Sequence, residues 1–178
     1  KGRLLLATLS LADPNFQHTV VLLCEHKKDV GSYGLILNRP ARVNQDLIDR
    51  IPFAKGRLFE GGPVHPETLQ VLHPFGKEAG GRVEVLEGVW LGADFDVLRK
   101  GFDDGRYDAE QCRFFLGYSG WGKGQLTAEF AEETWISVTA THNLVLDTPY
   151  NRLWSETVKY HRQNNPLFQH FPENPSFN

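Results

Sequence analysis

Four glycines stand among the eight residues Gly117–Gly124 (GYSGWGKG), between an expected strand at Cys112–Leu116 and an expected helix at Gln125–Glu133. Glycines at this density indicate unusual backbone torsions or a close neighbour. A glycine-rich turn from a strand into a helix can also direct free amide groups toward an anion. Candidate ligand contacts in this segment are therefore Gly120, Trp121, Gly122 and Gly124.

The spacing of this segment matches neither of the common phosphate-binding patterns. A Walker loop has Ser or Thr after its lysine, whereas Lys123 is followed by Gly124. The dinucleotide pattern needs a third glycine at an offset that Gly120–Gly124 lacks. Two interpretations remain open: a tight strand-to-helix turn in which the glycines let Tyr118 and Trp121 pack against backbone, and an anion or small-ligand site at the helix start.

Two polar turns, Asp13–Asn15 and Asn38–Pro40, adjoin the most apolar strand-like stretches of the chain. If these stretches pair as a hairpin, their outer ends meet, and Arg39 lies beside Asp13 or Asn15. Side-chain hydrogen bonds to nearby amides explain Asp13 and Asn38 structurally. We expect an Arg–Asp brace in preference to a catalytic pair, and we retain Asp13, Asn38 and Arg39 as candidate ligand-binding residues.

A possible metal or nucleophile site involves His18, Cys24 and His26, which share parity on one expected strand. A Cys-x-His pair lacks the remaining ligands of a zinc site unless His65 or His73 folds close to it. A buried thiol with edge histidines is the favoured interpretation. The sequence therefore predicts no metal, no cofactor and no catalytic residue.

The expected elements describe a single domain over residues 1–178, with an irregular docked tail at 163–178. Strands outnumber helices, and regular crossover helices do not separate them, which indicates an α+β fold with a mixed, strongly curved sheet. A helix is expected at Pro149–His161. The motif Asp147–Pro149 lies at its start and is interpreted as its cap.

The composition argues against nucleic acid and membrane as partners. The formal net charge is −3, the sequence pI is about 6.2, and the basic residues are scattered, so direct nucleic-acid binding is not expected. No apolar run approaches the ~20 residues of a membrane span, and we expect no secretion signal. The two cysteines, Cys24 and Cys112, lie in apolar runs and read as buried free thiols, which predicts a cytoplasmic protein.

Ordered motifs along almost the whole chain resemble the bacterial YqgE/AlgH family. The motifs are LADPNF (11–16), TVVLLCEH (19–26), GLILNRP (34–40), FEGGPV (59–64), FFLGYSGWGKGQL (114–126), DTP (147–149), LW (153–154) and FPENPSFN (171–178). The resemblance implies an α+β fold of bifurcated, coiled β-sheets that form a pseudo-barrel with peripheral helices. It also implies that Lys123 is not a family phosphate ligand, because other members often have a small residue or proline there.

The functional label that comes with this family is that of a transcriptional regulator, without established catalytic or DNA-contact residues. We therefore expect a non-catalytic binding or regulatory module with a protein or small-molecule partner, acting by a route other than direct DNA binding. The alternative is an enzyme that acts on a small anionic substrate at Gly117–Gly124, with Arg39 as the anion clamp and Asp13 or a histidine as acid or base.

Overall fold

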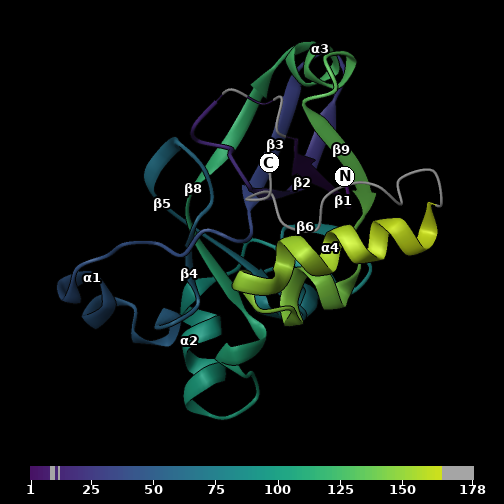
Figure 1. Cartoon of the computed structure of the whole chain (residues 1–178). Helices are drawn as coiled ribbons and strands as arrows, with labels where there is room; N and C mark the ends of the chain where they lie inside the picture. Colours follow the sequence, from purple (N-terminus) through teal and green to yellow (C-terminus); the bar gives the residue numbers. More distant parts are fainter. Residues whose placement is uncertain (9–10, 12, 166–178) are drawn as a thin grey trace.

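A computed structural model describes residues 1–8, 11 and 13–165, which form a coiled sheet with helices around it (Figure 1). The nine strands of the described part are β1 (Arg3–Ala7), β2 (Val20–Lys27), β3 (Gly31–Ile36), β4 (Leu58–Glu60), β5 (Val64–His73), β6 (Val83–Leu86), β7 (Val89–Leu91), β8 (Arg113–Gly122) and β9 (Trp135–Thr139). The helices are α1 (Gln45–Arg50), α2 (Phe95–Asp103), α3 (Gln125–Ala131) and α4 (Tyr150–Asn164). Short 3₁₀ turns lie at Pro52–Ala54, Gly76–Ala79 and Ala109–Gln111.

The sheet has the order β6-β7-β5-β8-β3-β2-β1-β9, with β4 attached to β8. The β4–β8 pair is parallel and every other pair is antiparallel, so the sheet is mixed. The long strand β8 divides it: residues 113–118 of β8 pair with β4 and β5, and residues 119–122 pair with β3. The sheet is not closed, and its bifurcated, coiled form agrees with the predicted fold class.

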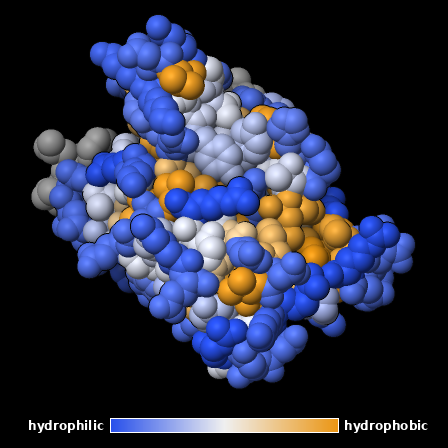
Figure 2. All heavy atoms as spheres, turned by 180° about the vertical axis from the view of Figure 1, so that it is seen from behind, coloured by the Kyte–Doolittle hydropathy of each residue, from blue (hydrophilic) through white to orange (hydrophobic). Residues whose placement is uncertain are grey.

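The core lies between the coiled halves of this sheet and the elements packed on them. β1 and β2 consist largely of apolar residues on both faces, as expected for strands covered on both sides, and Leu4, Leu5 and Leu6 are all fully buried. In Figure 1, α4 crosses in front of β6, and the opposite side has a broad apolar area crossed and bordered by hydrophilic residues (Figure 2). None of the helices in the described ranges is both long and apolar enough to cross a bilayer.

The helices differ in how their first turns are capped. Asn44 caps α1 through a 3.0 Å bond from Leu47 N to its Oδ1. The cap predicted for the last helix is wrong: α4 starts one residue later, at Tyr150, and no side chain caps it. The preceding residues form an unexpected π-helical turn, Asn143–Asp147. α4 also continues through Asn164, beyond the predicted end at His161, and the remaining tail residues from 166 lie outside the described part.

The glycine segment is not the turn that its composition predicted. β8 continues through Gly122, so most of Gly117–Gly124 is sheet rather than loop. Gly117 and Gly62 are required because two chain segments cross almost in contact. A Cβ on Gly117 (φ +66°) would lie 2.6 Å from the carbonyl oxygen of Gly62, and one on Gly62 would overlap the Tyr118 backbone. The motifs FEGGPV and GYSG are therefore two sides of one close backbone contact.

Candidate functional site

The open end of the β2–β3 hairpin brings the two polar turns together, as the sequence predicted. Asn38 closes this end: its Oδ1 accepts a 2.8 Å bond from Val20 N, and its Nδ2 donates a 2.9 Å bond to His18 O. Arg39 follows directly, and its Nη1 donates a 2.7 Å bond to the carbonyl oxygen of Asn15. The predicted contact between Arg39 and the Asp13–Asn15 turn is therefore present.

Asp13 shapes its own turn and does not brace Arg39. Its Oδ1 accepts a 2.8 Å bond from Asn15 N, which fixes the turn. Phe16, the second residue after Pro14 of this turn, is also anchored, because its ring stacks on Trp121 with ring centroids 5.9 Å apart. Within the described part, Asp13 and Arg39 form no ion pair, so the expected Arg–Asp brace is replaced by an arginine–carbonyl contact.

A pocket of about 330 Å³ opens beside Arg39. Backbone pairing holds two of its lining segments together: Glu60 N donates a 2.8 Å bond to Arg39 O, and Pro40 and Phe59 form an isolated antiparallel β-bridge. The lining residues come from the 13–16 turn, the 38–42 segment, the 60–66 segment and β8; they are Asn15, Arg39, Ala41, Arg42, Glu60, Gly62, Pro63, Pro66 and Leu116. Three charged side chains thus share one pocket with apolar walls.

The charges of this pocket are not neutralised by one another. Over residues 1–8, 11 and 13–165, no ion pair within 4.0 Å involves Arg39, Arg42 or Glu60. Arg42 and Glu60 are residues that the sequence reasoning missed. Arg42 lies two residues after Pro40 and Glu60 directly after Phe59, and the Pro40–Phe59 bridge brings them together; no local sequence pattern signalled this bridge.

The structure does not bring the other candidates to this pocket. Gly120 and Gly122 pair with Tyr33 and Gly31, at the opposite end of β3 from Arg39. The amide of Gly122 is occupied by a 3.0 Å bond to Gln125 Oε1. Gly124 (φ +75°) precedes α3, which has seven residues.

Trp121 is also a packing residue in this structure. It is buried, and its Nε1 donates a 2.8 Å bond to Glu129 Oε2. Its ring packs edge-on against Trp135 at 5.9 Å between centroids. The glycine segment therefore ends in an aromatic cluster rather than in a set of free amides.

The possible metal or nucleophile site at Cys24 is dispersed. Burial raises the pKa of the Cys24 thiol, and its Sγ lies 3.6 Å from Leu22 O. His26 is exposed and its Nδ1 contacts Ser32 Oγ at 2.8 Å. No cluster of three potential metal ligands is present among the described residues.

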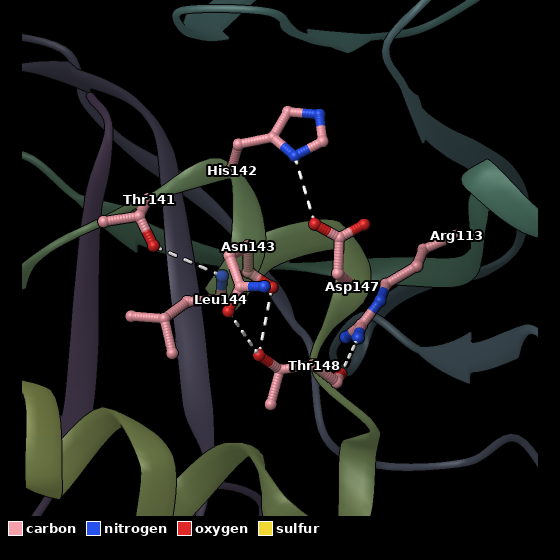
Figure 3. Close-up of polar contacts among 7 residues, drawn as sticks. All are labelled: Arg113, Thr141, His142, Asn143, Leu144, Asp147 and Thr148. Carbon is pink, nitrogen blue, oxygen red and sulfur yellow. Dashed lines mark hydrogen bonds and ion pairs between the residues drawn. The ribbon is translucent and has the colours of Figure 1, made fainter.

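A second polar cluster surrounds the π-helical turn (Figure 3). His142 Nδ1 lies 3.3 Å from Asp147 Oδ2, and Thr148 Oγ1 donates a 3.0 Å bond to Asn143 O. The buried guanidinium of Arg113 donates to the carbonyl oxygens of Thr148 and Leu37. Arg113 therefore ties the DTP motif to the backbone just before Asn38.

The electrostatics of Arg113 follow from its burial. The pKa of Arg113 is lowered to about 10, mainly by desolvation and in part by the nearby Arg57, while Asp147 opposes the shift. The guanidinium also lies 5.5 Å from the centre of the Phe59 ring. Arg113 is thus a buried structural cation, while Arg39 and Arg42 line the pocket.

Comparison with known proteins decides the family. The family model described as AlgH-like matches residues 4–164. The chain belongs to the AlgH-like family. Among AlgH-like relatives, UPF0301 proteins from Chlorobium limicola and Chlorobaculum tepidum are 38% and 40% identical over 178 residues, with 99% of this chain and 95% of each relative covered.

Solved AlgH-like structures support the same fold. The solution structure of AlgH from Pseudomonas aeruginosa is 30% identical, with a TM-score of 0.70 over 96% of this chain and 94% of that one. A crystal structure of a Corynebacterium diphtheriae protein, 20% identical, has a TM-score of 0.69 over 96% of this chain and 91% of that one, and shares the fold. The predicted family is therefore confirmed.

Proposed function

We propose that this protein is a cytoplasmic, non-catalytic binding module that takes a small anionic ligand in the pocket beside Arg39 and Arg42. The observation that carries the proposal is the pair of arginines lining one pocket, neither of which forms an ion pair with a carboxylate in the part of the chain that the structure describes. Guanidinium groups suit carboxylate and phosphate oxygens because they present several N–H donors in a fixed plane. Arg39 is preoriented for this role by its bond to Asn15 O.

Glu60 makes the pocket selective. Glu60 lines the same cavity. Its carboxylate repels an anion placed close to it, so the ligand should place its charge at the arginine side and a hydrogen-bond donor toward Glu60. The apolar walls, Pro63, Pro66 and Leu116, suit an uncharged part of the ligand. A regulatory role would then follow from ligand-dependent contact with a protein partner.

Pyrophosphate is the probe that tests this site. We expect pyrophosphate to raise the melting temperature of the purified protein, because a ligand that binds only the folded state stabilises that state. At a ligand concentration of a hundred times the Kd, the stabilisation is about 2.7 kcal/mol. Arg42→Gln and Arg39→Gln should each weaken binding, and Glu60→Gln should strengthen it. Arg99→Gln, on the exposed face of α2, is the matched control and should behave as wild type.

An equal melting shift in wild type and both pocket arginine variants would refute the assignment of this pocket. Failure of pyrophosphate, citrate and inorganic phosphate to shift the wild-type protein would refute the anion class itself. The alternative, an enzyme at Gly117–Gly124, lacks the convergence with Arg39 that it requires. Mass spectrometry of the incubated probe tests it, since the binding module leaves the probe unchanged.

A further inference from the structure

A second pocket, of about 240 Å³, lies where the coiling of the sheet brings β6 and β7 close to β2 and β3. Its walls come from strands far apart in the sheet order: Cys24 from β2, Tyr33 from β3, Val83 from β6 and Leu91 from β7. The same approach is visible at the N-terminus, where Lys1 Nζ donates a 2.8 Å bond to Glu84 O. The pocket is thus the mouth of the incomplete barrel, a usual place for small-molecule sites.

The inside of this mouth is uncharged and mostly apolar, with Gln70 as a polar residue of its wall. Burial raises the pKa values of Cys24 and Tyr33, so both groups keep their protons. The Tyr33 ring packs against Tyr118 with centroids 4.8 Å apart and forms a fixed wall. β2 has a register shift between Leu23 and Glu25, and bulges of this kind often accompany functional sites.

One cation is available at the rim. Glu25, the rim carboxylate, is held in an ion pair with Lys27. Arg82 has its aliphatic stem over Gly92, and no ion pair or side-chain hydrogen bond of its guanidinium is present in the described part of the chain. Among the described residues, the rim therefore offers one unpaired positive charge, Arg82, above an uncharged and mostly apolar cavity.

We propose that this mouth binds a small carboxylic acid with an apolar body, its carboxylate on Arg82 and its body against Tyr33, Val83 and Leu91. Charge complementarity selects the acid over neutral apolar molecules, because Arg82 is the cation that the rim leaves unpaired. The cavity is smaller than the ~300 Å³ at the low end of ligand pockets, which restricts the ligand to a short chain or a single ring. The site is independent of the pocket beside Arg39.

Octanoate is the probe, followed by ¹H–¹⁵N NMR titration of the full chain, with octanamide as its neutral counterpart. We expect octanoate to shift amides of Glu25, Tyr33 and Leu91, and Arg82→Gln to weaken octanoate binding about tenfold, as loss of one charge-assisted bond would. Octanamide should bind weakly and equally to both proteins. Arg99→Gln, on the exposed face of α2 and outside the lining of both pockets, is the matched control and should bind octanoate as wild type does.

Three results would overturn the proposal: no amide shifts with octanoate, shifts confined to other parts of the molecule, or unchanged affinity in Arg82→Gln. Equal affinity of octanoate and octanamide for wild type would replace the acid by a neutral apolar ligand and would also overturn it. Because Arg82 is exposed, the variant should fold, and its dispersed amide spectrum checks this.

Discussion

At the scale of single residues, Glu129 shows how one side chain holds three elements together. Its carboxylate accepts hydrogen bonds from Trp121 Nε1 on β8 at 2.8 Å and from Trp135 Nε1 on β9 at 2.6 Å. Gln125, one turn earlier on α3, donates to the other oxygen at 2.9 Å. The position of α3 on the sheet therefore depends on one acceptor.

Replacing Glu129 with alanine should lower the free energy of unfolding by about 1 to 3 kcal/mol, because two buried indole N–H groups lose their acceptor. Urea unfolding followed by tryptophan fluorescence measures this change. Glu132→Ala, on the exposed surface next to α3, is the control and should change stability by less than about 0.5 kcal/mol. Equal stabilities for the two variants would contradict the assigned role.

His73 should make stability depend on pH. Burial lowers the pKa of His73 below its usual value, and the 2.8 Å contact of Nε2 with Gly92 O opposes this shift in part. Nδ1 accepts a bond from Phe75 N, so the folded state holds the neutral ring. As pH falls through 6.5, the unfolded chain gains this proton before the folded chain does, and stability is lost.

We expect the urea concentration at the unfolding midpoint to decrease as the pH is lowered from 7.5 to 5.5. This decrease should be smaller in His73→Gln, which keeps a donor for Gly92 O. Parallel pH profiles for the two proteins would show that His73 does not carry the effect. The buried His161, whose pKa is also lowered by burial, accounts for part of the slope that remains.

At the scale of elements, the crossing of the 61–62 and 117–118 segments explains why glycines gather there. Gly117→Ala should destabilise the protein by more than about 2 kcal/mol, because the left-handed torsion costs about 1 to 2 kcal/mol and the new methyl group meets the Gly62 carbonyl. Gly124→Ala is the matched control: its torsion is similar (φ +75°), but nothing lies within 4 Å. Thermal unfolding should separate the two variants, and equal losses would contradict the packing explanation.

The elements predictable from sequence were those with continuous apolar runs. TVVLLCE and GLILN became β2 and β3 because both faces of these strands are covered, and the meeting of their ends near Arg39 followed from hairpin geometry. The strand character of Gly117–Gly122 was not predictable, because isolated glycines weaken strands, and the partner that requires them lies at Gly61–Gly62. Arg42 and Glu60 were missed for the same reason: a long-range bridge brings them together.

At the scale of the whole molecule, the acidic balance predicts how the protein behaves toward DNA. With a net charge of −3, the protein gains little from counterion release. A gel-shift titration with duplex DNA at low salt should show no complex, although low salt favours backbone contacts most strongly. A shifted band that weakens steeply as salt is added would refute this prediction and would support direct regulation of transcription.

The place of β1 in the sheet has a consequence for synthesis of the protein. β1 lies between β2 and β9, and Arg3 pairs with both Leu23 and Thr139. At ~5 to 20 residues per second, the ribosome needs on the order of ten seconds to make the chain between these two partners. During that interval the edge of β1 that pairs with β9 stays unpaired, and the apolar side chains of β1 stay incompletely covered. The emerging chain should therefore be a substrate for chaperones until β9 has been made.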